Sequence, residues 1–369
     1  MIDIPSGNPA LLFALRIAVC FVLVVLPTLA EAEQDAWPMA VSHQVLNTSG
    51  QPVGIELAIV VFDDGLDAFD ERDARHKLRR VEARIATVLL RDVITEGQRF
   101  GPVRVLPADT AFADLTITGS VVHSDGRDML LRIRAIDVSG ELWFEQVFRW
   151  TASEQDYLRP SDEPFRPLFV AIANALWTRA QTLSPASIAQ LEALAKMRYA
   201  AELAPQIFND YVQQVEGLIR LTRLPAVNDP MLARIDRIRR QEALFIDTID
   251  QQYRDLQDAL GPVYTLWRRS SLEQGTYLAS YLSRANQRSD DGDSGSFARM
   301  QQAYSTYRSV KMQEQDLFEI ATGFDNETAP TVLDSGERVV RLEGTLEQQY
   351  VQWRDILRRL ITLERGSLE

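Results

Sequence analysis

The sequence is poor in cysteine and histidine. Its one cysteine, Cys20, lies in an apolar stretch near the N-terminus. Removal of that stretch leaves a chain without a thiol, which excludes disulfides, thiolate catalysis and cysteine-ligated metals. The three histidines, His43, His76 and His123, are scattered and form no pair at helical spacing. We therefore expect neither a zinc site nor a histidine-based catalytic triad.

Positive charge is also scarce. The chain has 39 cationic residues against 52 acidic ones, and its formal net charge is −13. This excess of negative charge repels phosphate backbones, so nucleic acid is not an expected partner. Apolar residues make up 46% of the 369 residues, which is enough for a chain of this length to bury proper cores.

Catalytic signatures are missing as well. The sequence contains no HExxH, GxSxG, P-loop or GxGxxG pattern. These motifs report a metal, a nucleophile or a phosphate-binding loop, each placed by a defined local backbone. We predict no catalytic residue, no cofactor and no metal site, and we expect a protein that is not an enzyme.

The N-terminus carries a predicted signal peptide, residues 1–32. Residues 10–30 are almost wholly apolar, with Arg16 as the one interruption, and Ala30-Glu31-Ala32 follows. Small residues at Ala30 and Ala32 suit a signal peptidase, which predicts cleavage after Ala32. The alternative is a retained anchor, because the apolar run is long enough to span a bilayer. Cleavage predicts a bacterial periplasmic or secreted protein without a stable transmembrane anchor.

Residues 33–183 are predicted to form an α+β domain, with a mixed sheet and two helices. Residues 55–62 indicate a buried strand, residues 72–95 an amphipathic helix and residues 103–106 a short strand. Three strands follow at 115–122, 129–136 and 142–150, separated by the turns Asp125-Gly126 and Ser139-Gly140. A second helix is predicted over 164–183.

The segments that carry this order are IELAIVVFDDG, LLRDVITEGQRFGPVRVLP, ADLTITGSVV, LLRIRAIDVSGELWFEQVF and PFRPLFVAIANALW. Over residues 54–183 the chain resembles small domains of the bacterial envelope. These are the TolB N-terminal domain, the lipoprotein activators of penicillin-binding proteins, and CsgG-like and FlgO-like secretion components. The resemblance implies a non-enzymatic binding or assembly module in the envelope and transfers no site residue. The chain departs from this group in having neither a β-propeller repeat after the domain nor a lipobox before it.

Residues 184–369 are predicted to form an all-α domain, a bundle of long helices. Ser184-Pro185 is typical of a helix start, and Pro205 predicts a helix through Ile219. The clearest pattern starts at Asp229-Pro230, and Gly261-Pro262 is expected to end that helix. Further helices are predicted over 264–287, 297–322 and 345–364, the last with a capping box of Thr345 and Gln348.

Two weak candidates for a polar or ligand site remain. Asp63, Asp64 and Asp67 follow a buried strand, where carboxylates can act as a catalytic pair, although a polar turn is the simpler interpretation. Aromatic residues of the helical half can line a groove for a glycan or lipid, although helical spacing is more typical of a core. The aromatic residues concerned are Tyr253, Tyr264, Trp267, Tyr304, Tyr307, Tyr350 and Trp353.

These observations favour an exported envelope protein that acts as a non-catalytic interaction or assembly module and binds other envelope proteins. The alternatives are an envelope hydrolase that uses paired carboxylates, and a glycan- or lipid-binding module. The sequence identifies neither the partner nor the oligomeric state.

Export is directly testable. In fractionated native cells we expect the protein in the envelope or secreted fraction, with an intact mass that corresponds to a chain starting at Glu33. Cleavage after Ala32 is the physical reason, since the apolar run then leaves the mature chain. Recovery of the full-length polypeptide from the cytosol would contradict both the compartment and the envelope role.

Overall fold

The computed structural model describes residues 37–66, 74–158, 163–226, 228–287, 296–327, 331–334 and 339–366. The chain divides into two units, Met1–Met39 and Ala40–Glu369, and the elements below belong to the second. The predicted signal peptide, with Ala30 and Ala32, lies outside the described residues. No helix in the described ranges combines the length and hydropathy that a membrane crossing requires.

The N-terminal part of the second unit is α+β, as predicted. Its elements in chain order are β1 (Leu57–Val60), α2 (Ala74–Gly97), β2 (Val103–Leu106), β3 (Leu115–Ser124), β4 (Asp128–Asp137), β5 (Leu142–Thr151), the 3-10 helix η1 (Glu154–Tyr157) and α3 (Arg166–Ala180). The strands form one mixed sheet in the order β2-β1-β3-β4-β5. β1 is parallel to β2 and β3, whereas β3, β4 and β5 are antiparallel neighbours.

One face of this sheet is packed against α2 and α3. Strand residues point alternately to the two faces, and the alternation of β3 and β4 places Leu115, Ile117 and Ile133 on the packed face. Leu90 of α2 and Leu168 of α3 belong to the same buried cluster. Burial of this apolar surface is what holds the sheet and the two helices together.

The opposite, outer face of β3, β4 and β5 is polar. Thr118 of β3 lies opposite Arg134 of β4, which lies opposite Glu145 of β5, and Ser120 lies opposite Arg132. Arg132, Arg134 and Glu145 are exposed. This combination of one packed and one solvated face is typical of antiparallel strands.

The C-terminal part is mainly helical. Its elements are α4 (Pro185–Leu203), α5 (Pro205–Phe208), the 3-10 helix η2 (Asn209–Tyr211), β6 (Val212–Val215), β7 (Leu218–Leu221), α6 (Pro230–Gln287), α7 (Ser296–Glu327), β8 (Thr331–Asp334), β9 (Val339–Leu342) and α8 (Leu346–Gly366). Two antiparallel hairpins, β6-β7 and β8-β9, interrupt the helices. The prediction of an all-α region was therefore wrong, although the helical character is confirmed.

The predicted break at Gly261-Pro262 is also wrong, because α6 continues through Pro262. Proline removes one backbone donor and crowds the preceding turn. Here Leu260, Tyr264 and Trp267, on either side of Pro262, are buried in one cluster with Val81 of α2. This burial offsets the local cost and keeps the helix continuous.

The helix predicted from Pro205 through Ile219 starts at Pro205 as α5 but ends at Phe208, and the hairpin β6-β7 follows η2. Glu216 and Gly217 have φ angles of 53° and 84°. Two successive positive φ angles are the mark of the type I′ turn that joins two antiparallel strands. By contrast, the helix starts predicted at Ser184 and Thr345 are confirmed, since the Ser184 hydroxyl accepts from the Ser187 amide and Thr345 and Gln348 form their capping box.

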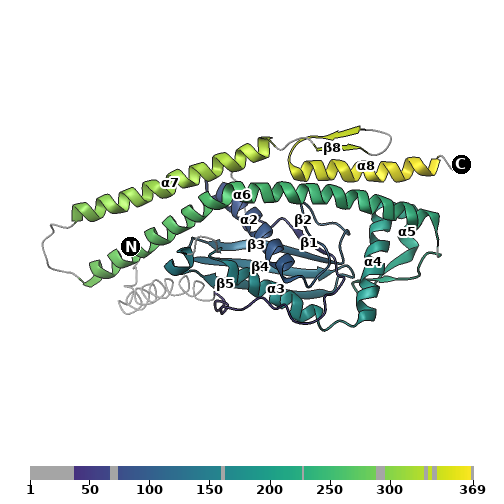
Figure 1. Cartoon of the computed structure of the whole chain (residues 1–369), viewed down its shortest axis with the longest axis horizontal. Helices are drawn as coiled ribbons and strands as arrows, with labels where there is room; N and C mark the ends of the chain where they lie inside the picture. The colour runs from purple at the N-terminus through teal and green to yellow at the C-terminus, as the bar shows by residue number, and fades with distance from the viewer. Residues whose placement is uncertain are drawn as a thin grey trace, which may run out of the picture. The chain divides into compact units, whose positions relative to one another are not determined.

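Helix α6 contacts five other elements from both parts of the unit. It packs against β2, α2, η1, α7 and α8, and Figure 1 shows it running beside α7 and α8. At the turn between β3 and β4, the α6 backbone comes so close that a Cβ atom on Gly126 would lie 2.3 Å from the Arg268 carbonyl oxygen. The turn therefore needs glycine for its backbone angle and also for space.

A matched pair of variants separates these two requirements. Gly126 and Gly140 both occupy turns with positive φ, of 86° and 89°. A Cβ atom on Gly140 meets nothing nearer than 3.8 Å. We expect Gly140→Ala to cost about 1–2 kcal/mol of unfolding free energy from the left-handed backbone alone. Gly126→Ala should cost clearly more in urea unfolding, and equal costs would argue against the close approach of α6.

Candidate functional site

In the predicted acidic turn, the two described carboxylates accept hydrogen bonds from backbone amides of the same turn. Asp63 Oδ1 accepts the Gly65 amide at 2.8 Å, and Asp64 Oδ1 accepts the Leu66 amide at 3.1 Å. Each carboxylate therefore stabilises its own turn, as the simpler interpretation of the sequence holds. Asp67 lies outside the described residues. Within the described ranges, no group of three or more His, Cys, Asp or Glu side chains could hold a metal ion.

The aromatic residues of the helical half divide into two sets. Most belong to buried clusters: Tyr253, Tyr264, Trp267, Tyr350 and Trp353. Tyr304 and Tyr307 of α7 are exposed. The buried set provides core packing, so only two of these aromatic rings are available to a ligand.

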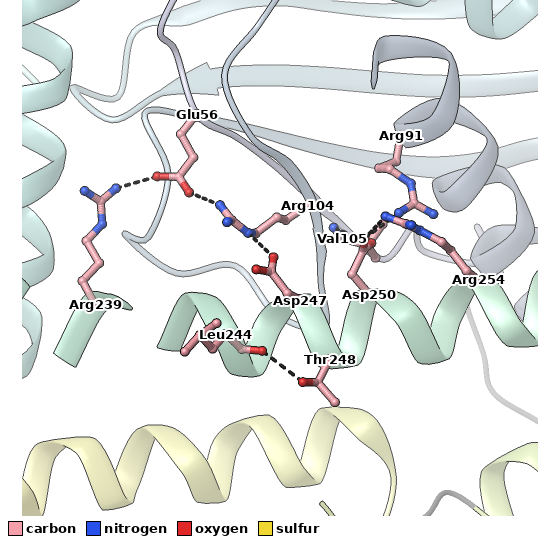
Figure 2. Close-up of polar contacts among 10 residues, drawn as sticks. All are labelled: Glu56, Arg91, Arg104, Val105, Arg239, Leu244, Asp247, Thr248, Asp250 and Arg254. Atoms are coloured by element: carbon pink, nitrogen blue, oxygen red, sulfur yellow. Dashed lines mark hydrogen bonds and ion pairs between the residues drawn. The ribbon is translucent and has the colours of Figure 1, made fainter. Parts of the chain in front are cut away.

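Charged side chains concentrate where α6 meets the edge of the sheet (Figure 2). The Glu56 carboxylate, just before β1, accepts from Arg104 of β2 and, at 2.8 Å, from Arg239 of α6. Arg104 also donates to Asp247 of α6 at 2.6 Å. Arg239 further donates to the Phe112 carbonyl at 2.7 Å. Each of these charges has an opposite partner, which makes this network a docking contact between α6 and the sheet.

Asp250 extends this contact to the backbone of the edge strand. One carboxylate oxygen accepts the Val105 amide of β2 at 3.2 Å. The other accepts from Arg91 of α2 at 2.5 Å and from Arg254 at 3.0 Å. Asp250 and Arg91 are both buried. A side chain from α6 thus satisfies a backbone donor that an edge strand otherwise leaves unpaired.

Two further buried acids are also paired. Glu242 of α6 accepts from Tyr199 of α4 at 2.6 Å and from Tyr350 of α8 at 2.9 Å. Glu82 of α2 accepts from Ser124 of β3 at 2.6 Å and from Tyr264 of α6 at 3.0 Å. Both acids join three elements that are distant in the sequence. Their role in the fold is to fix helix positions.

An open recess of about 490 Å³ lies at one end of the outer face of the sheet. Thr116, Thr118, Arg134 and Ile136 of β3 and β4 form its floor. Its walls come from the β2–β3 connection, the β4–β5 turn, α4 and the hairpin β6-β7. Its volume is within the range of about 300–1,000 Å³ that is usual for small-ligand sites.

The hairpin β6-β7 is fixed against the sheet at the recess. The Ile219 amide donates to the Ser139 carbonyl of the β4–β5 turn at 2.7 Å. Arg198 of α4 donates to the neighbouring Val138 carbonyl at 2.6 Å. These two bonds hold the hairpin and α4 to the β4–β5 turn, so the recess is a built feature of the fold.

Two of the three acids that line the recess are already engaged. Asp137 accepts from the Ser139 amide and hydroxyl and from the Trp143 indole, at 2.9, 2.6 and 3.1 Å. Glu202 of α4 pairs with Arg354 of α8 at 2.9 Å and accepts the Ala111 amide at 3.2 Å. Neither group is therefore readily available to a ligand.

Asp109 and Arg198 are the charged pair that remains. Partial desolvation raises the pKa of Asp109, although the nearby positive charge of Arg198 lowers it. Partial desolvation likewise lowers the pKa of Arg198, whereas the negative charges of Glu202, Asp109 and Asp137 raise it. Within the described part of the chain, no ion pair joins Asp109 to Arg198 at 4.0 Å or less. Opposite charges thus face one recess without neutralising each other directly.

Sequence reasoning missed the recess entirely. Its lining comes from segments as far apart as Asp109 and Ile219, and one wall is the hairpin that was predicted as a helix. One signal was present in the sequence: Val215-Glu216-Gly217-Leu218 places glycine between two β-branched or apolar runs. A hairpin prediction there would have placed this wall beside the sheet.

No protein-family model matches the sequence, and no curated protein matches it either. Among solved structures, the chain is similar to a PelC dodecamer from Paraburkholderia phytofirmans, with 18% sequence identity and a TM-score of 0.23. The match covers 36% of this chain and 92% of that one. At this TM-score the match supports no conclusion about the chain.

Glu82 gives a prediction for the pH dependence of stability. Burial raises its pKa above the ordinary 4.5, against the opposing effects of Arg79, Ser124 and Tyr264. A raised pKa means that the folded chain holds this proton more tightly than the unfolded chain does. The stabilisation is therefore complete below pH 4.5 and is lost as the pH rises through the folded value.

We expect the unfolding free energy of the wild type, relative to that of Glu82→Gln, to fall as the pH rises from about 4.5 toward neutrality. Chemical unfolding at a series of pH values measures this difference. Glu273→Gln, at an exposed position on α6, is the matched control for the exchange of a carboxylate for an amide. A pH-independent difference for Glu82→Gln would disprove the assignment of a raised pKa.

Proposed function

We propose that the chain is an exported bacterial envelope protein that acts as a non-catalytic interaction or assembly module. Its expected compartment is the periplasm or the cell exterior, on the evidence of the apolar run before Ala32. Residues 54–183 are proposed to form a domain of the TolB N-terminal-like type, and the helices after residue 184 a bundle attached to it. The order strand, helix, strand, three-strand meander, helix supports this assignment.

The outer face of β3, β4 and β5 is the observation that carries the proposal. The two helices of the domain cover the other face, and α6 covers the edge at β2. The outer face presents Arg132 and Arg134 among hydroxyl side chains of β3, in a chain of net charge −13. The side chain of Arg132 forms no ion pair or hydrogen bond with the residues that the structure describes.

Exposed guanidinium groups on a rigid sheet suit recognition of carboxylates, because the planar group donates two parallel hydrogen bonds. We therefore expect the partner to be an envelope protein with an acidic surface. The acids of α6 support a non-catalytic role in a different way. Glu242, Asp247 and Asp250 are engaged in ion pairs that hold the helix in place.

Reversal of one charge tests this surface. We expect Arg132→Glu to abolish recovery of a specific partner from detergent-treated envelope fractions, because it replaces attraction by repulsion. Arg308→Glu, at an exposed position of α7, is the matched control and should retain the partner. The measurement is quantitative pull-down with the tagged mature protein. Absence of any partner above background, or equal recovery by both variants, would contradict the proposal.

A further inference from the structure

The recess beside the hairpin β6-β7 has the composition of a binding site for a small polar molecule. Asp109 and Arg198 supply opposite charges that no ion pair within the described chain joins. Arg198 commits one nitrogen to the Val138 carbonyl, which orients the guanidinium and leaves other N–H donors for a ligand. A bound molecule with one positive and one negative group would satisfy both side chains.

The neutral lining favours a ligand with amide groups. Thr116 and Thr118 on the floor and Gln214 on the hairpin provide hydroxyl and amide groups that both donate and accept. Peptide N–H and C=O groups need such partners when they leave water. No aromatic side chain lines the recess in the part of the chain that is described. The recess therefore lacks the aromatic ring on which a sugar ring often stacks, which favours a peptide-like ligand over a glycan.

The charge balance of the recess points the same way. The engaged acids Asp137 and Glu202 stand against Arg134 and, through the pair with Glu202, Arg354 of α8. The lining itself holds three acids, Asp109, Asp137 and Glu202, and two arginines, Arg134 and Arg198, so charges of both signs face the recess. A ligand with a net charge of either sign gains little from such a site, whereas a ligand with separated opposite charges gains at both ends.

We propose that this recess binds a zwitterionic ligand, a free amino acid or a short peptide, with its ammonium group at Asp109 and its carboxylate at Arg198. The carboxylate accepts charge-assisted hydrogen bonds from the guanidinium, and the ammonium donates to the Asp109 carboxylate. The volume of about 490 Å³ accommodates either source of this chemistry. This site is distinct from Arg132, which does not line the recess.

Isothermal titration of the mature protein with four probes tests the proposal. The probes are L-alanine, tri-L-alanine, N-acetyl-tri-L-alanine and tri-L-alanine amide. We expect at least one of the two zwitterions to bind, and comparison of them identifies the free amino acid or the peptide as the better ligand. If tri-L-alanine binds, acetylation or amidation should each weaken its binding at least tenfold, because each removes one charge. If only L-alanine binds, N-acetyl-L-alanine and L-alanine amide serve the same purpose.

Two variants assign the charges to residues. Asp109→Asn should remove the difference between free and acetylated ligand, and Arg198→Gln should remove the difference between free and amidated ligand. Asp255→Asn and Arg308→Gln, at exposed positions of α6 and α7 outside the recess, should leave both differences unchanged. The comparison among ligands needs no variant, so it remains decisive if Arg198→Gln does not fold.

Three outcomes would overturn the proposal. One is the absence of binding by either zwitterion at millimolar concentration to protein shown to be folded by thermal unfolding. Another is equal affinity for the free and the blocked forms. The third is binding that Asp109→Asn leaves unchanged. The pull-down with Arg132→Glu is independent of all three, since that residue lies outside the recess.

Discussion

The hydrogen bond from the Val105 amide to Asp250 is the contact on which the arrangement of the helices depends. It closes the β2 edge of the sheet with a side chain of α6, while the same carboxylate holds Arg91 of α2. A backbone donor on an edge strand has a fixed position. Its pairing with Asp250 therefore sets the position of α6 along the sheet, and α7 and α8 pack on α6 in turn.

Buried charge of this kind contributes specificity more than stability. Removal of a carboxylate and an arginine from water costs about as much as their attraction returns, whereas loss of one partner is expensive. Four acids take part in polar contacts between α6 and other elements. Asp250 and Glu242 belong to α6 itself, whereas Glu56 and Glu82 accept hydrogen bonds from α6 side chains. A shift of α6 by one turn would leave several of these groups buried without partners. The network thus penalises alternative positions of α6 that apolar packing alone would tolerate.

The sequence was informative wherever local rules decide the structure. Alternation and the Asp125-Gly126 and Ser139-Gly140 turns predicted β3, β4 and β5, and the Ser184 and Thr345 caps predicted the starts of α4 and α8. It failed where packing overrides those rules, as at Pro262, which Leu260 and Tyr264 hold inside α6. The Glu216-Gly217 turn was overlooked because the apolar residues around it also fit a helical period.

The recess was missed because the hairpin β6-β7, which forms one of its walls, was predicted as a helix. The bond from Ile219 to Ser139 and the packing of Ile219 and Leu221 against Val138 fix the hairpin β6-β7 beside the β4–β5 turn. The hairpin in turn forms one wall above the floor at Thr116 and Thr118. The floor comes from the α+β part, whereas Arg198 and the hairpin come from the helical part. Occupation of the recess by a ligand would therefore stabilise the contact between both parts. The same reasoning explains why no single segment of the sequence reveals this site, since neither part contains it alone.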